Sequence, residues 1–151
     1  MYHKTRSVTV VIFLVSEVFA VLQLGTAASL SSALLPKWHI HVVNGLSKVT
    51  LFVHCKSKDD DLGVHNLVTR GDEFQWTFQV NFWATTLYWC YLKKPNADVS
   101  FESFWVEQTH MWLQYRCTDK NCIWTAKDDG IYLRNNPDGV DERIHEWINE
   151  T

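Results

Sequence analysis

V-T-L-F-V-H-C-K-S-K-D-D-D-L-G, residues 49–63, is the stretch that indicates the fold. Its first half alternates, with Val49, Leu51, Val53 and Cys55 on one side of the chain, and this period of two is typical of a β-strand with one buried face. The three aspartates that follow cannot be buried without partners, so the chain must surface and turn there. An inward cysteine on a core strand, followed by an acidic turn, predicts one layer of a disulfide-linked extracellular β-domain.

The amino terminus has the three parts of a secretory signal peptide. Lys4 and Arg6 form a basic start, residues 8–24 are mostly apolar, and residues 25–29 are small. A membrane anchor is the competing interpretation, but Glu17 in the middle of the apolar run would be costly inside a bilayer. We therefore predict a signal peptide at residues 1–28, with cleavage after Ala27 or Ala28, and secretion of the remainder.

Charge and length limit the functions that the mature chain can have. The full chain has 14 basic and 17 acidic side chains; residues 1–28 hold two basic and one acidic, which leaves 12 and 16 and a net charge of −4. A mildly acidic domain has no electrostatic footprint for nucleic acid or anionic lipid. A mature chain of this length forms one domain, and none of its later stretches is long and apolar enough to insert into a membrane.

Short segments rich in strand-forming residues follow one another along the mature chain. Gly, Pro, Asn and Asp separate them, and no helical period lies between them. About eight such strands predict an all-β fold, an antiparallel β-sandwich, after a short lead at residues 29–37. The expected strands are 38–44, 48–56, 65–69, 73–80, 85–92, 99–106, 111–117, 122–126 and 131–133, within a domain at residues 38–134.

Residues 135–151 have a different pattern. After the break at 135–139, Val140, Ile144, Trp147 and Ile148 recur at helical spacing, with acidic residues near the start of the run. This pattern predicts a short amphipathic C-terminal helix. Such a helix either packs on the sandwich or presents its apolar face to a partner.

The four cysteines, Cys55, Cys90, Cys117 and Cys122, all lie in the mature part. An even number in a secreted chain predicts two disulfides, and three pairings are possible. A local Cys117–Cys122 bridge would close the turn at residues 118–121. Zinc is disfavoured because the only close pair lacks a second pair.

Other candidate chemistry is sparse. His39, His41 and His54 are candidates for a metal site, but isolated histidines on exposed strands are more common. The three aspartates lack the ligand spacing of a calcium loop, and we find no nucleophile motif or phosphate loop. We therefore predict no metal, no cofactor and no enzymatic activity. One weak glycosylation sequon begins at Asn149, near the end of the chain.

An ordered series of motifs spans residues 38–133. Asn44 is followed by H-C-K-S-K-D-D-D-L-G at 54–63, Gly71 with F-x-W-x-F at 74–78, T-L-Y-W-C at 86–90, and C-x4-C-x-W ending at Trp124. This order resembles the plant self-incompatibility S-protein homologue family. The positions that carry the resemblance are Cys55, Ser57, Asp61, Leu62, Gly63, Trp76, Phe78, Cys90, Cys117, Cys122 and Trp124.

The resemblance implies a small secreted plant protein with a β-sandwich and two disulfides, whose founding relatives are stigma ligands for a receptor on pollen. It also favours pairing Cys55 with Cys122 and Cys90 with Cys117 over the local bridge. The tail after Asn135 lies outside what the resemblance covers.

Three classes of function follow from these observations. The first is a monomeric extracellular ligand that a cell-surface receptor recognises through polar loops. The second is a carbohydrate-binding or defence module that uses exposed tryptophans, with Trp38, Trp83 and Trp112 as candidates. The third, a small hydrolase, lacks a predictable pair of catalytic groups. For the first, we predict receptor contacts at Asp59, Asp60, Asp61, Lys93 and Lys94.

Overall fold

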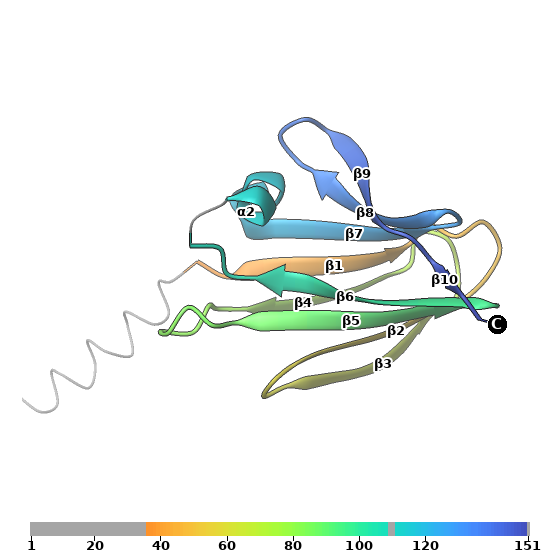
Figure 1. Cartoon of the computed structure of the whole chain (residues 1–151), viewed down its shortest axis with the longest axis horizontal. Helices are drawn as coiled ribbons and strands as arrows, with labels where there is room; N and C mark the ends of the chain where they lie inside the picture. The colour runs from red at the N-terminus through yellow and green to blue at the C-terminus, as the bar shows by residue number, and fades with distance from the viewer. Residues whose placement is uncertain (1–35, 109–110, 151) are drawn as a thin grey trace, which may run out of the picture. The chain divides into compact units, whose positions relative to one another are not determined.

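Two five-stranded β-sheets make up the part of the chain that the structure, a computed structural model, describes: residues 36–108 and 111–150 (Figure 1). Sheet A has the order β4-β1-β7-β8-β9, and sheet B the order β10-β6-β5-β2-β3. The predicted signal peptide at residues 1–28 lies outside the described residues. The strands are β1 (Trp38–Asn44), β2 (Leu51–Ser57), β3 (Asp61–Leu67), β4 (Glu73–Phe78), β5 (Leu87–Lys94), β6 (Ala97–Trp105), β7 (Asn121–Lys127), β8 (Gly130–Asn135), β9 (Val140–His145) and β10 (Ile148–Asn149).

Alternating residues of both sheets form the core, as the pattern in residues 49–56 predicts. Along β2, Leu51, Val53 and Cys55 are fully buried, and the residues between them are not. Trp124 on β7 is also fully buried, and its indole N–H donates to the Ser103 carbonyl of β6 at 2.9 Å. This bond links sheet A to sheet B and provides the partner that a buried indole needs.

One strand pair departs from the expected antiparallel arrangement. β1 pairs antiparallel with β4 but parallel with β7, which follows much later in the chain. A tight hairpin would require an antiparallel pair, whereas two strands joined by a long stretch of chain are free to run parallel. The described fold is therefore a two-sheet β-structure with one parallel contact.

Asn44 at the end of β1 is a fully buried polar residue. Its side-chain amide donates to the carbonyls of Val49 at 3.1 Å and Leu67 at 2.8 Å, and its oxygen accepts the N–H of Leu46 at 2.9 Å. One side chain thus satisfies three backbone groups where the chain passes from sheet A to sheet B.

Residues 111–117 form a helix and not the strand that their alternation predicts. α2 (Trp112–Arg116) is followed by the 3-10 turn η1 (Thr118–Lys120). The Glu107 carboxylate accepts the N–H of Leu113 at 2.9 Å and that of Gln114 at 3.2 Å. These bonds satisfy amides of the first helical turn, so a carboxylate upstream in the chain favours the helix.

The predicted C-terminal helix is also wrong, because residues 140–149 form two short strands. β9 pairs antiparallel with β8, and β10 pairs antiparallel with β6. The turn between β8 and β9 places Gly139 at a φ of 67°, which favours glycine, and its N–H donates to the Asn135 carbonyl. Pairing with open sheet edges thus outweighs the helical period of the side chains.

The two disulfides join Cys55 to Cys90 and Cys117 to Cys122. The pairing that the family resemblance favoured is therefore wrong, and the local bridge is confirmed. The cause is the strand order: β2 and β5 are neighbours whose register puts Cys55 opposite Cys90, whereas Cys122 lies on β7 in the other sheet.

Candidate partner-binding loops

The acidic turn between β2 and β3 is exposed and held in shape by its own residues. The Ser57 hydroxyl accepts the N–H of Asp59 at 3.3 Å and that of Asp60 at 3.0 Å, and the Ser57 N–H donates to the Asp60 carbonyl at 2.8 Å. Both carboxylates are directed to solvent in an ordered turn, so they are available to a partner.

Asp61 has partners within the domain. Its carboxylate accepts the Gly63 N–H at 2.9 Å and lies 2.7 Å from the His54 ring. The bond from Gly63, and then that from His54, lower the pKa of Asp61 below its ordinary value. This carboxylate stabilises the start of β3 and is less free to bind a partner than Asp59 or Asp60.

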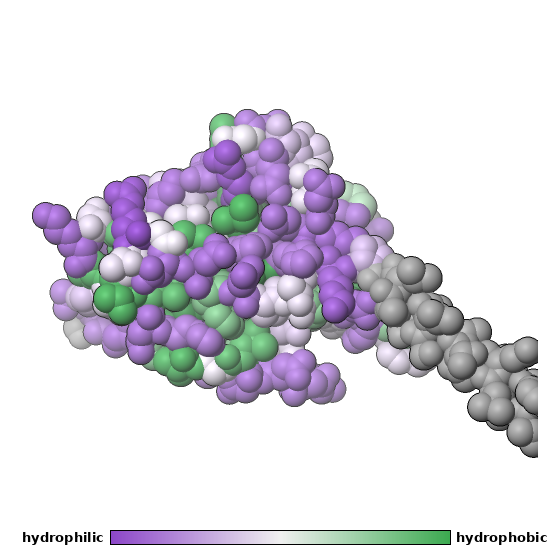
Figure 2. All heavy atoms as spheres, turned by 180° about the vertical axis from the view of Figure 1, so that it is seen from behind, coloured by the Kyte–Doolittle hydropathy of each residue, from purple (hydrophilic) through white to green (hydrophobic). Residues whose placement is uncertain are grey.

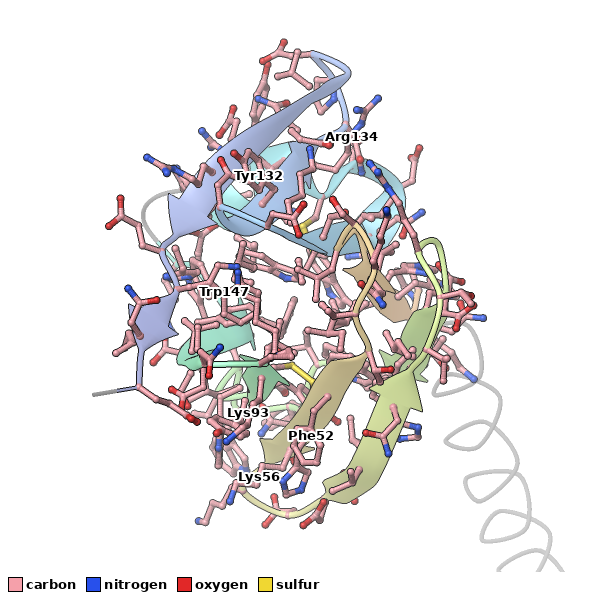
Figure 3. The ribbon with its side chains drawn as sticks, turned by 90° about the vertical axis from the view of Figure 1, so that its right-hand side faces the viewer. Phe52, Lys56, Lys93, Tyr132, Arg134 and Trp147 are labelled. Carbon is pink, nitrogen blue, oxygen red and sulfur yellow. A yellow bond between two sulfur atoms is a disulfide. The ribbon has the colours of Figure 1, made fainter. Side chains whose placement is uncertain are left out.

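Lys93 and Lys94 contact the C-terminal segment, residues 146–150. Figure 3 labels Lys93 and, in that segment, Trp147. Lys93 forms a 2.5 Å ion pair with Glu150, which raises the pKa of the lysine. The Lys94 ammonium donates to the Asp128 carbonyl at 2.7 Å and lies 4.8 Å from the centre of the Trp147 ring. Both lysines therefore help to fix the chain terminus.

The structure places the predicted acidic and basic residues at opposite ends of sheet B. In the β2–β5 register Ser57 is opposite Tyr88, whereas Phe52 is opposite Lys93. Five residues of extended strand span about 17 Å, so one small contact cannot include both groups. Asp59 and Asp60 remain in the candidate site, and Lys93 and Lys94 do not.

The most exposed apolar residues lie near the acidic turn; sequence reasoning missed Phe82 and named Trp83 only as a candidate for binding carbohydrate. Phe82 and Trp83, in the loop between β4 and β5, are 92% and 77% exposed, the highest values among the large hydrophobic residues of the described chain. Their rings meet edge to face, 5.2 Å apart at 84°. We call Phe82 and Trp83 the aromatic tip. The signal in the sequence that could have identified it is a Phe-Trp pair that lies outside every predicted strand.

Hydrogen bonds within the loop hold the aromatic tip outward. The Asn81 side-chain oxygen accepts the Thr85 N–H at 2.8 Å, and its amide donates to the Thr85 hydroxyl at 2.9 Å. The Asn81 N–H donates to the Thr86 hydroxyl at 2.9 Å, and its carbonyl accepts the Ala84 N–H at 3.0 Å. A loop closed in this way presents its aromatic rings at low entropic cost.

A hollow of about 440 Å³ lies between the acidic turn and the β4–β5 loop. Burial, and then the charge of Asp60, raise the pKa of the Tyr88 hydroxyl, which borders the hollow. The surroundings are hydroxyls, amides and carboxylates, which suit hydrogen bonding to a polar partner. The lining residues are Ser57, Lys58, Asp59, Asp60, Gln79, Asn81, Thr85, Thr86, Leu87, Tyr88 and Trp89.

The candidate tryptophans differ in exposure. Trp83 is exposed, Trp112 is partly buried and stacks on Trp105, and Trp38 is buried at 7% exposure. Trp76 and Trp124 lie in the core. Trp83 is thus the candidate that can contact a partner without a rearrangement of the domain.

The histidine candidates do not form one site. His39 and His41 lie on β1 in sheet A, whereas His54 lies on β2 in sheet B. Across residues 36–108 and 111–150, no group of three or more His, Cys, Asp or Glu side chains is arranged to hold a metal ion. Asn149 is exposed on β10, and its glycosylation stays a prediction.

No helix within the described residues combines the length and hydrophobicity needed to cross a bilayer. Figure 2 shows one face of the surface as mostly hydrophilic, with apolar residues gathered in separate patches.

The two sheets and the two disulfides define the class of protein as a small, twice-crosslinked β-domain. The family model described as plant self-incompatibility protein S1 matches residues 39–147, and the chain belongs to this family of small secreted plant proteins. The match includes β9, so the expectation that the tail lies outside the family is wrong.

Relatives and a solved structure agree with this assignment. The chain is 46% identical to S-protein homolog 1 and 44% identical to S-protein homolog 74, both from Arabidopsis thaliana; each match covers 74% of this chain and 72% of the relative. It also resembles a solved self-incompatibility protein homologue, described as one of a widespread family of small, highly stable, secreted plant proteins. That match has a TM-score of 0.58 at 17% identity, covers 76% of this chain and 97% of the other, and supports the fold.

Proposed function

We propose that this protein is an extracellular ligand, a monomer, that a cell-surface receptor recognises through the end of the sandwich formed by the aromatic tip and the acidic turn. The observation that carries the proposal is the exposure of Phe82 and Trp83 on a loop closed by its own hydrogen bonds. Exposed aromatic anchors on a rigid scaffold are typical of residues that dominate binding energy in protein interfaces.

Burying the aromatic tip in a receptor would contribute a large free energy of binding. Burying a Phe or Trp side chain removes about 150–250 Å² from water, or about 4–6 kcal/mol before the costs of association. The loop is already closed by Asn81, so little of this is lost in ordering it. We expect Trp83→Ala to weaken receptor binding by about 2–4 kcal/mol.

The chemistry next to the aromatic tip favours binding over catalysis. The hollow is lined by hydroxyl, amide and carboxylate groups, by Lys58 and by the apolar Leu87 and Trp89, and its lining residues include no histidine or cysteine. Both disulfides lie elsewhere, so no thiolate nucleophile is offered there. Asp59 and Asp60 suit a basic rim around an apolar pocket of the receptor.

The test is a binding isotherm of the purified secreted protein on plant protoplasts or their solubilised membrane proteins. Phe82→Ala and Trp83→Ala should each weaken binding strongly, and Asp59→Lys with Asp60→Lys should slow association. Val64→Ala and Val68→Ala are matched controls, because these apolar side chains are 52% and 63% exposed but lie on and just after β3.

Melting temperatures must stay at the wild-type value in every variant. Unchanged binding of both aromatic variants, or equal loss in the Val64 and Val68 controls, would refute the proposed surface. Light scattering at the concentrations of the assay checks that the ligand is a monomer.

A further inference from the structure

The outer face of sheet B carries a regular arrangement of side chains that the proposed receptor contact does not use. Three strands contribute, and cross-strand register aligns their outward residues in rows. The rows are Lys56–Trp89–Glu102, His54–Tyr91–Ser100 and Phe52–Lys93–Asp98. Figure 3 shows Phe52, Lys56 and Lys93 on the same side of this sheet.

Three aromatic rings lie within these rows and are partly exposed: Phe52, Trp89 and Tyr91. Phe52 and Tyr91 meet edge to face at 6.0 Å, and the Lys56 ammonium lies 5.7 Å from the Trp89 ring. Trp89 and Tyr91 are two residues apart on one strand, so their rings are about 7 Å apart along it. We call Phe52, Trp89 and Tyr91 the aromatic platform.

Polar groups of β6 border the platform on one side. Glu102 and Ser100 are exposed on β6, and the Tyr91 hydroxyl donates to Asp98 at 3.2 Å. Burial, and then the charge of Asp98, raise the pKa of Tyr91. Partly exposed aromatic rings bordered by hydrogen-bonding groups suit a pyranose, which has apolar C–H faces and a rim of hydroxyls.

We propose that the aromatic platform binds an uncharged saccharide chain that runs along β5. The charges in the rows favour a neutral ligand over a polyanion, because Glu102 and Asp98 balance Lys56 and Lys93. Lys93 is moreover already paired with Glu150.

This inference does not depend on the receptor. The aromatic tip is in the β4–β5 loop, whereas the platform is on the outer face of β2 and β5. A protein with both surfaces is held in a polysaccharide matrix while its loops stay free for a receptor.

The test is titration calorimetry of the whole mature protein with cellohexaose as the neutral probe and with galacturonate oligomers as the anionic one. We expect saturable binding of cellohexaose, at least about tenfold weaker in Trp89→Leu and in Tyr91→Leu. Trp89→Phe should retain most of the binding because it keeps an aromatic ring. Phe82→Ala and Trp83→Ala should leave it unchanged.

One further variant tests the platform without removing an aromatic ring, in case Trp89→Leu or Tyr91→Leu does not fold. Ser100 is exposed beside Tyr91, so Ser100→Glu blocks the platform without touching the core, and it should weaken binding while the melting temperature stays constant. The proposal is overturned if cellohexaose does not bind, if the galacturonate oligomers bind as well or better, or if only the tip variants lose binding.

Discussion

Replacing Asn44 by alanine should destabilise the domain more than any surface change. The side chain is fully buried and bonds three backbone groups, those of Leu46, Val49 and Leu67. Alanine cannot make these bonds, and Asn44 and Leu46 have no surface exposed to water. The donor and acceptors are then left without a partner, which costs more than the bonds themselves contribute.

The three hydrogen bonds of Asn44 determine how much free energy of unfolding the alanine variant loses. A buried backbone group left without its partner costs about 1–3 kcal/mol. The Val49 carbonyl is only partly buried, so we take the lower half of the range that three such groups allow and expect a loss of about 3–5 kcal/mol. A domain of this size has about 5–15 kcal/mol of stability in total. The urea midpoint should therefore fall by about 2–3 M.

The assay is equilibrium urea unfolding, followed by tryptophan fluorescence with both disulfides intact. Asn66→Ala is the matched control, because Asn66 is exposed on β3 and should change stability by less than about 0.5 kcal/mol. Asn44→Asp keeps the size and the acceptor for Leu46 but loses both donors, so it should be at least as destabilising near neutral pH. A loss below about 1 kcal/mol in Asn44→Ala would refute the argument that these bonds are needed.

Three further predictions concern the disulfides, the C-terminal segment and acid stability. The disulfides close loops of 35 and 5 residues, so replacing Cys55 and Cys90 by serine should cost about 4 kcal/mol of stability in urea unfolding, and replacing Cys117 and Cys122 about 2 kcal/mol. Equal costs would contradict the pairing, which non-reducing peptide mapping checks directly. The Trp147 indole donates to the Lys127 carbonyl at 2.7 Å, so Trp147→Ala should cost about 2 kcal/mol of stability, whereas Ile148→Ala, at the exposed neighbouring residue, should cost less than about 0.5 kcal/mol. Equal melting temperatures for the two variants would argue against a stabilising role of Trp147. Hydrogen bonds from Asn135, and then from Arg116, lower the pKa of Glu142, so its contribution to stability is present above the ordinary glutamate pKa of about 4.3 and is lost as the pH falls through the lower folded value. Melting temperatures measured between pH 6 and 3 should depend less on acid in Glu142→Gln than in the wild type, and parallel curves would exclude the effect.

The sandwich follows from local pattern because strand alternation needs no knowledge of partners. Leu51, Val53 and Cys55 are buried as the period of two predicts, and the aspartates that follow turn at the surface. The two wrong predictions of secondary structure have the opposite cause, namely contacts with residues outside the segment itself. Residues 112–116 are helical because Glu107 bonds their first amides, and residues 140–149 are extended because β8 and β6 offer open edges.

The candidate site shows the same division. The acidic turn was predictable, because consecutive aspartates must reach water. Lys93 and Lys94 were not, since their partners, Glu150 and Trp147, come to them only when the C-terminal segment crosses from sheet A to sheet B. Figure 3 shows Trp147 between the strands of the two sheets.

Alternation of apolar residues, cysteine number and the order of motifs are properties of the chain read locally. They were enough to predict a secreted, twice-crosslinked β-domain and its family. Which cysteines pair, which face of sheet B carries the aromatic platform, and which loop projects the aromatic tip all depend on strand neighbours and register. Those are settled by contacts between residues far apart in the chain, and no local pattern encodes them.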